Sequence, residues 1–591
     1  MSIRVGNCSG FYGDRLSAMR EMLEGGELDY LTGDYLAELT MLILGRDRMK
    51  DESLGYAKTF VRQMTDSMAL AKELGVKIVA DAGGLNPAGL AARLREIAAS
   101  QGLDVVIAHV EGDDLRERAD ELSFGDVLTA NAYLGAFGIA AALAGGADVV
   151  VTGRVTDASV VVGPAIAHFG WGREDLDQLA GAVVAGHVIE CGTQATGGNF
   201  SGFAQVNMST PLGFPIAEIS ADGSVVITKH EGTGGAVTID TVTAQLVYEV
   251  GSPLYLGPDV STRLDSMSLT QDGPDRVTIS GVTGVAPPDT TKVCLNELGG
   301  FRNSVEFLLT GLDIAEKAAL VEHQMEAAFA SGTRPETVEW HLDRTDLTDP
   351  ATQAQATSLL RLHVRSAQPE PVGRAFSDAA IQLALASYPG FSVSRPPGAA
   401  APYGVYRPAY LTQAKVPHKV VHASGRVEDI PPPTKTASGA DRTLRDGESV
   451  QDAPLADRIA PLGDWAADTV RAPLGRLAHA RSGDKGGDAN IGVWIPAGHP
   501  RRDDAYEWLV SFLDDETVRE LLSEAATLDI EIHPLANLRA VNIVIHGLLG
   551  EGVASSTRLD PQAKGVGEWL RARDCAIPTV LLPGAVTKTL L

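Results

Sequence analysis

The chain is poor in cysteine, in aromatic residues and in positive charge. Its 591 residues include 4 cysteines and 5% aromatic residues, and 49 Lys and Arg face 76 Asp and Glu, which gives a formal net charge of −27. This charge excludes nucleic acid and anionic membrane surfaces as partners, because such phosphate groups are bound by clustered Lys and Arg. The cysteines are far apart, with no C-x-x-C pair and no Cys/His cluster at zinc spacing. We therefore expect no disulfide framework and a cytoplasmic location.

Long apolar runs are also lacking. The N-terminal residues MSIRVGNCSGFYGD have no charged segment followed by an apolar core, so they do not resemble a signal peptide. The one long uncharged run, 130–147, is rich in Ala and Gly and predicts a buried helix, since a membrane span needs about 20 strongly apolar residues. With 44% hydrophobic and 21% charged residues, the composition is that of folded domains without a membrane segment.

The first 215 residues alternate short β-branched runs with longer helical patterns, which is typical of a doubly wound, largely parallel α/β sheet covered on both faces. We expect strands at 3–5, 76–80, 105–110 and 149–152, and helices at 15–23, 56–74, 88–99, 129–143 and 159–168. Residues 216–429 predict an α+β second portion. Its expected strands are 224–228, 241–250, 276–280 and 359–365, and its expected helices are 314–330 and 376–388.

The last part of the chain separates from the rest by composition. Residues 430–471 predict a linker, because three prolines (431–433) begin a polar, charge-dense segment with too little apolar surface to fold alone. Residues 472–591 predict a small ferredoxin-like α+β domain. Its expected strands are 476–480, 490–496, 530–534 and 540–546, and its expected helices lie within 503–526 and at 565–573.

Polar loops follow the predicted parallel strands. Ligands bind beyond the carboxyl ends of the strands in an open parallel sheet, so we expect these loops to meet at one edge and form the site. The first loop reads G-x-x-x-G-x-x-G before a helix, which favours anion binding by backbone N–H groups, with a tight turn as the alternative. It matches neither a dinucleotide nor an ATP fingerprint, so no cofactor is assigned. Its candidate binding residues are Gly6, Ser9, Gly10 and Gly13.

Two later loops supply further candidates. Asp81 is a candidate general base and Asn86 a candidate substrate ligand; alternatively, Asn86 starts the next helix and Asp81 braces its loop. Arg154 offers a planar fork to a carboxylate or phosphate, with Asp157 three residues further on. The alternative for Arg154 is an ion pair with Asp157.

A proton-transfer pair is predicted near residue 190. His187 and Glu190 are three residues apart and would share a helix face, and such a pair can move protons near neutral pH. The glycine-rich loop that follows adds the hydrogen-bonding side chains of Thr193, Gln194 and Asn199. No set of side chains has the spacing of a metal site.

A second candidate anion site lies in the C-terminal domain. Residues 480–490, expected between two strands, contain three glycines together with Arg481 and Lys485. A turn whose charges satisfy one another is the alternative.

These motifs together resemble the acyclic terpene utilisation (AtuA-type) family. The matching segments are GNCSGFYGD, LTGDYLAELTM, DAGGLNP, ADVVVTGRVTDASVVVGP and GHVIECGTQATGGNF. The segment ARSGDKGGDANIG resembles that of the small ferredoxin-like domain in longer members. The resemblance implies a role in bacterial catabolism of citronellol-type acyclic terpenes, alongside acyl-CoA carboxylase and dehydrogenase steps.

The sequence therefore predicts an enzyme of acyclic terpene or branched acyl-CoA or carboxylate degradation. Its chemistry would be acid–base catalysis of the hydratase/lyase or isomerase type on an anionic small molecule, with His187, Glu190 and Asp81 moving protons. The alternative is a non-catalytic acyl-CoA-binding or scaffold partner of an acyl-CoA carboxylase. Size and class also predict a homo-oligomer.

Overall fold

A computed structural model describes residues 2–437 and 462–582. The chain divides into two compact units. Unit 1 consists of Met1–Asn296, Tyr406–Val553 and Asp560–Leu591, and unit 2 of Glu297–Val405 and Ala554–Leu559. Most of the predicted linker, residues 438–461, lies outside the described residues.

An eleven-stranded sheet forms the base of unit 1, in the order β11-β12-β8-β7-β1-β2-β3-β6-β4-β18-β19. Its centre is parallel and contains β1 (Ser2–Asn7), β2 (Tyr30–Gly33), β3 (Lys77–Ala80), β6 (Val149–Thr152) and β4 (Ile107–Glu111). Antiparallel strands extend one edge: β7 (Pro215–Ser220), β8 (Val225–Lys229), β12 (Arg276–Ser280) and β11 (Ser268–Gly273). The other edge carries β18 (Lys419–Val421) and β19 (Val427–Asp429). The predicted α/β fold with a largely parallel central sheet is confirmed.

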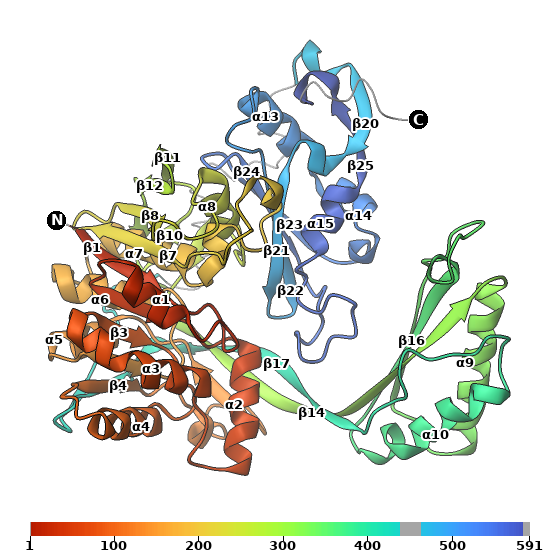
Figure 1. Cartoon of the computed structure of the whole chain (residues 1–591), viewed down its shortest axis with the longest axis horizontal. Helices are drawn as coiled ribbons and strands as arrows, with labels where there is room; N and C mark the ends of the chain where they lie inside the picture. Colours follow the sequence, from red (N-terminus) through yellow and green to blue (C-terminus); the bar gives the residue numbers. More distant parts are fainter. Residues whose placement is uncertain (1, 438–461, 583–591) are drawn as a thin grey trace. The chain divides into compact units, whose positions relative to one another are not determined.

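Helices cover both faces of the central sheet (Figure 1). One hydrophobic core joins it to α1 (Ala18–Gly25), α3 (Lys58–Leu74) and α4 (Pro87–Ser100), and another to α5 (Phe137–Ala144), α6 (Ser159–Phe169) and α7 (Leu176–Ile189). A further helix, α2 (Glu38–Lys50), follows the loop after β2. Local signals set the helix ends. Gly75 ends α3 with φ +70°, and the Asn86 side chain accepts a 2.9 Å hydrogen bond from the Gly89 N–H at the start of α4.

Two predicted elements in the first 296 residues were wrong. The helix expected at 129–143 begins only at Phe137, because Thr129–Ala132 form a strand, β5, that pairs with β14 (Thr290–Thr310). The strand expected at 241–250 is instead part of helix α8 (Ile239–Leu246). Thr238 starts α8 through a reciprocal hydrogen-bonded cap with Thr241, which outweighs the β-preference of the Thr- and Val-rich sequence.

The C-terminal part of unit 1 contains a four-stranded antiparallel sheet in the order β21 (His479–Lys485), β22 (Asp488–Trp494), β24 (Ala540–Ile545), β23 (Ile530–Leu535). Its helices are α13 (Arg502–Phe512), α14 (Asp515–Leu521) and α15 (Val566–Ala572), and β20 (Thr469–Pro473) pairs with β25 (Asp574–Pro578). The loop expected at 480–490 was wrong: these residues belong to both strands of a hairpin, and only Gly486 and Gly487 form the turn. A three-stranded sheet of β9 (Leu254–Leu256), β10 (Ser261–Arg263) and β13 (Thr283–Val285) completes the unit.

Unit 2 is a smaller α+β structure. Its sheet has the order β15 (Thr337–Asp343), β16 (Thr357–Ser366), β14, β17 (Ala401–Thr412), with α9 (Ile314–Ser331) and α10 (Arg374–Gln382) packed on its apolar face. The chain passes from unit 1 to unit 2 within the long strand β14 and returns within β17.

A helix that crosses a membrane must be both long and strongly apolar. In the described ranges, no helix combines the necessary length with sufficient apolar character. All four cysteines are free thiols.

Candidate functional site

Charged side chains converge at the carboxyl ends of the central parallel strands of unit 1. We call Asp34, Asp81, Arg154, Asp157 and Glu190 the acid cluster. The first four follow β2, β3 and β6, and Glu190 follows α7. All except Asp157 are at most 7% exposed, whereas the Asp157 side chain keeps 27% of its surface accessible. The expected meeting of distant strand-end loops is therefore present, with Asp157 as its most accessible member.

Arg154 is the cation inside the acid cluster. Its Nη1 lies 2.5 Å from Asp157 Oδ1 and 4.0 Å from Asp81 Oδ2, and donates a 3.0 Å hydrogen bond to the Leu36 carbonyl. The guanidinium carbon also lies 4.3 Å from the centre of the Tyr133 ring. The ion pair with Asp157 is thus formed, and the role of Arg154 as a substrate anchor stays a prediction.

The buried carboxyl groups hold protons more tightly than ordinary carboxyls. One oxygen each of Asp34, Asp157 and Glu190 lies within 4.8 Å of the other two. Burial and the charge of Asp81 raise the pKa of Asp34, and burial and the charge of Asp157 raise the pKa of Glu190. Burial also raises the pKa of Asp81 to about 7, although a hydrogen bond to Asp34 and the charge of Arg154 oppose it. Of these groups, Asp81 has its pKa nearest to neutral pH, and the raised pKa values of Asp34 and Glu190 favour their neutral forms.

His187 lies beside this group as a neutral imidazole. Its Nδ1 is 3.4 Å from Glu190 Oε1, and its ring centre is 5.0 Å from that of Tyr255. Burial and the nearby charge of Lys485 lower the pKa of His187 to about 4. The predicted His187–Glu190 pair is therefore brought together without a hydrogen bond between the two side chains, and its role in proton transfer stays a prediction.

The same oxygens could hold a divalent cation. Asp34, Asp157 and Glu190 offer hard oxygen ligands of the kind that Mg²⁺ or Ca²⁺ takes. Such a cation would compete with the protons and with Arg154. Sequence spacing did not reveal this grouping, because the three residues come from three separate loops.

Two residues that were not among the predicted site residues extend the cluster, Glu38 and Lys292. Glu38 accepts hydrogen bonds from Tyr133 Oη at 2.7 Å and Lys292 Nζ at 3.0 Å. Burial opposes ionisation of Glu38, but the charges of Lys292 and Arg154 outweigh it and hold its pKa below the usual range. The Lys292 side chain keeps 29% of its surface accessible. Lys292 thus adds an accessible positive charge, and no motif pointed to it because it lies on β14, far away in sequence.

The C-terminal domain also contributes to this region. Lys485 Nζ donates a 2.7 Å hydrogen bond to the Glu249 carbonyl and lies 5.6 Å from the centre of the Tyr255 ring. The Tyr255 ring also lies beside His187, with 5.0 Å between the two ring centres, so Lys485 and His187 contact the same aromatic ring.

Arg481, in contrast, ties two segments of unit 1 together. It donates hydrogen bonds to the Asn199 carbonyl at 2.9 Å and to the Gln194 side chain, and its guanidinium lies 4.3 Å from the centre of the Tyr248 ring. These contacts use the guanidinium of Arg481 and the side-chain oxygen of Gln194, two groups that were expected to bind substrate, whereas Asn199 takes part through its backbone carbonyl. The geometry supports a structural role for them.

Other predicted binding residues have local structural partners. The Gly6 position packs against Met22 and Leu28, and the Asn86 side chain caps α4. Ser9 donates a 3.0 Å hydrogen bond to the Phe11 carbonyl, and Thr193 accepts one from Thr196 at its own carbonyl. Gly13 lies exposed in the turn before α1. None of these five contacts reaches the acid cluster.

Gly10 is the exception in the first loop. A Cβ atom there would lie 2.6 Å from the carbonyl carbon of Cys191, which follows Glu190. We expect Gly10→Ala to shift the 190–191 backbone and to lower the free energy of unfolding by about 1–3 kcal/mol. Gly13→Ala is the matched control, because its Cβ would meet only the mobile edge of the exposed Phe11 ring. Equal urea midpoints for the two variants would contradict this packing role.

A pH dependence of stability follows from Asp113, which accepts hydrogen bonds from the Arg154 N–H at 2.8 Å and Asn131 Nδ2 at 2.7 Å. Burial raises the pKa of Asp113 to about 7. Between about pH 4 and pH 7 the folded chain therefore binds a proton that the unfolded chain has lost, so the free energy of unfolding falls as the pH rises through this window.

We expect Asp113→Asn to reduce the slope of the free energy of unfolding against pH by on the order of 1 kcal/mol per pH unit. Urea unfolding from pH 5 to 8 measures it. Asp114→Asn is the control, because this adjacent residue is more exposed, and it should keep the wild-type slope. An unchanged slope in Asp113→Asn would contradict the raised pKa of Asp113.

Two protein-family models match the chain, one over its main part and one over its C-terminal domain. A family model described as "Acyclic terpene utilisation family protein AtuA" matches residues 3–422, and one described as "AtuA ferredoxin-like domain" matches residues 472–575. No curated protein and no solved structure matches.

Proposed function

The chain belongs to the acyclic terpene utilisation family, and from this membership and the acid cluster we propose that it is an enzyme acting on a branched acyl-CoA or carboxylate. The reaction would be a hydration, its reverse, or an isomerisation carried by acid–base chemistry. The single observation that carries this proposal is a set of buried carboxyls whose pKa values are raised, that of Asp81 to about 7, gathered behind the more accessible Asp157. A neutral carboxylic acid can donate a hydrogen bond to a carbonyl oxygen as charge develops on it.

In this proposal the substrate meets the cluster at Asp157. Arg154 holds the Asp157 carboxylate in place, and Asp34 and Glu190 lie within proton-exchange distance of it. Asp81, with a pKa of about 7, returns the proton. His187 takes the proton of Glu190 only transiently, because its lowered pKa of about 4 makes the imidazole the weaker base of the two. All three residues expected to move protons thus act in one relay.

The anionic end of the substrate needs a cation that solvent can reach. Arg154 is 2% exposed and already paired, whereas Lys292 and Lys485 are accessible and lie at the margin of the cluster. We assign the two lysines to the carboxylate or phosphate of the substrate, with Arg154 as the group that organises the carboxyls. The C-terminal domain would then complete the site through Lys485.

Proton exchange with solvent tests the proposal for hydration, dehydration and isomerisation alike. The full chain is incubated in D₂O with 3-methyl-branched enoyl-CoA and 3-hydroxyacyl-CoA thioesters and with the corresponding free acids. We expect deuterium in the substrate or product, detected by mass spectrometry, above the level without protein. Binding without exchange or turnover for the whole panel would overturn the proposal. Recovery of stoichiometric acyl-CoA carboxylase subunits in a pulldown would then favour a scaffold.

A further inference from the structure

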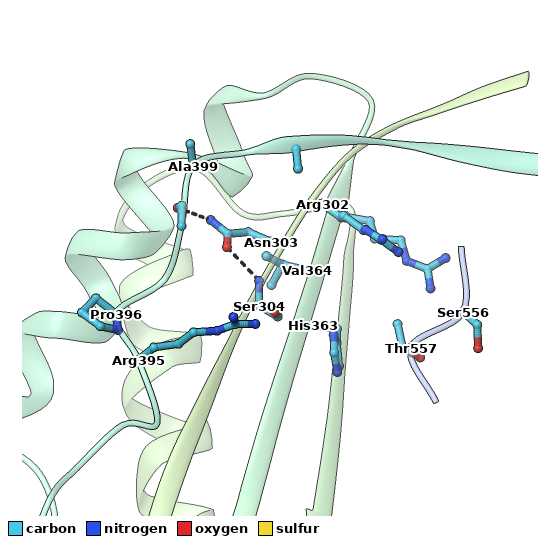
Figure 2. A pocket seen from close by; sticks show the side chains of 13 residues that line it. Arg302, Asn303, Ser304, His363, Val364, Arg395, Pro396, Ala399, Ser556 and Thr557 are labelled. Carbon is cyan, nitrogen blue, oxygen red and sulfur yellow. Dashed lines mark hydrogen bonds between the residues drawn. The ribbon is translucent and has the colours of Figure 1, made fainter. Parts of the chain in front are cut away.

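Unit 2 contains a cavity of about 430 Å³ that none of the roles above uses. The neighbouring strands β14 and β16 supply most of its floor, the 395–401 segment one wall, and Ser556 and Thr557 another. Figure 2 shows Arg302 near Ser556 and Thr557, while Arg395 extends from its loop toward Ser304. The volume lies within the range of small-molecule sites.

The lining is strongly basic. Three arginines, Arg302, Arg365 and Arg395, line the cavity, and none of its thirteen lining residues is acidic. The lining residue His363 is a neutral imidazole, because burial lowers its pKa to about 4. In a chain of net charge −27, such a concentration of positive charge has to be offset locally. Neither Arg302 nor Arg395 forms an ion pair with a carboxylate anywhere in the described ranges. The nearest carboxylate to Arg365 is that of Glu339, 3.9 Å away and already accepting a hydrogen bond from Thr557 Oγ1.

Strand pairing places two of these arginines side by side, and the repulsion between their charges destabilises the sheet. Arg302 and Arg365 are direct partners across β14 and β16, where like charges destabilise a sheet. Burial and the charge of Arg365 lower the pKa of Arg302. Backbone carbonyls hold the two side chains: Arg302 Nη1 donates to Ala554 at 2.7 Å and Arg365 Nη2 to Ser555 at 2.8 Å. The site is therefore organised before any ligand enters.

Unused donors remain on the cavity residues. Arg365 Nε and His363 Nε2 are buried and have no hydrogen-bond partner. Asn303 is held by the carbonyls of Val372 and Gly398, both at 2.9 Å, so the wall beside Arg395 is fixed as well. An anion that reached these donors would satisfy them and relieve the repulsion between the arginines.

We propose that this cavity binds a phosphate-bearing small molecule. A phosphoryl group carries close to two negative charges and three terminal oxygens, which match several guanidinium forks better than a single carboxylate does. The cavity is larger than phosphate alone requires, so the ligand is an organic phosphate of nucleotide scale. This inference is independent of the acid–base chemistry proposed for unit 1.

Calorimetric titration of the full chain with pyrophosphate and with ADP tests the proposal. We expect saturable binding in the millimolar range or tighter, weakened at least about tenfold by Arg302→Gln and by Arg395→Gln. Arg395 is exposed, so its substitution should leave the fold intact, and equal thermal midpoints of the unliganded proteins check this. Arg374→Gln is the matched control, because Arg374 lies in unit 2 outside the cavity with a 92% exposed side chain.

Three outcomes would overturn the proposal. The first is the absence of saturable binding of either probe. The second is binding that neither Arg302→Gln nor Arg395→Gln weakens, which would place the probe elsewhere. The third is tighter binding of the dicarboxylate succinate than of pyrophosphate, which would make the cavity a carboxylate site.

Discussion

Arg154→Met is expected to lower the free energy of unfolding by about 3–5 kcal/mol at pH 7. The substitution keeps most of the side-chain volume but removes the positive charge from a residue that is 2% exposed and faces Asp81 and Asp157. These carboxylates would then be buried without their cation. The deficit should shrink toward pH 5, because protonation removes the negative charges that Arg154 neutralises. Urea unfolding at pH 5, 7 and 8 measures both effects.

Arg116→Met is the matched control. Arg116 also pairs with an aspartate, Asp114, but both side chains are about 30% exposed, so its loss should cost less than about 1 kcal/mol. A deficit for Arg154→Met that is no larger than that of Arg116→Met, or that grows as the pH falls, would show that Arg154 does not stabilise the acid cluster.

Glu190→Gln should reduce the rate of proton exchange or turnover by about 10²–10⁴-fold. Glutamine has the shape of the protonated carboxyl but cannot give up its proton. Burial and the charge of Asp157 raise the pKa of Glu190, which favours the neutral carboxyl that glutamine mimics, so the variant should be about as stable as the wild type. A large loss of rate with unchanged stability separates a chemical role from a structural one.

Glu21→Gln provides the control for this substitution, because Glu21 is a surface residue paired with Arg15 and should keep full activity. If Glu190→Gln also keeps it, Glu190 is not a proton donor and the relay through His187 is refuted. Deuterium incorporation in D₂O, the readout used to detect the activity, serves for both variants.

The parallel core of the fold was predictable from sequence because its signals are local. The β-branched run at 149–152 is reproduced as β6, and Gly75 and Pro87 mark helix boundaries where they were expected. The errors arose where tertiary contacts or caps decide the structure. Thr129–Ala132 are extended because β14 lies beside them, and a threonine cap makes α8 a helix. Neither effect is visible in hydrophobic periodicity.

The acid cluster was predictable in part. Asp81, Arg154, Asp157, His187 and Glu190 were singled out because strand-end loops of a parallel sheet converge, and the structure brings them together. Lys292 lies near the start of the long strand β14, where sequence alone indicates no partner for its charge. Asn86 and Arg481 have the residue types of binding groups but are satisfied by a helix end and by carbonyl and amide oxygens. Residue type alone cannot separate these cases, because it does not specify which polar atoms are already satisfied.

The pairing of β4 with β18 has a consequence for synthesis on the ribosome. Strand β4 ends at Glu111. The strand that covers its free edge, β18, ends at Val421, about 310 residues later in the chain. At ~5–20 residues per second, this edge of the parallel sheet stays uncovered for roughly 15 to 60 s while the intervening polypeptide is translated. Exposed strand edges recruit other chains, so the nascent protein passes through a period in which chaperone protection matters most.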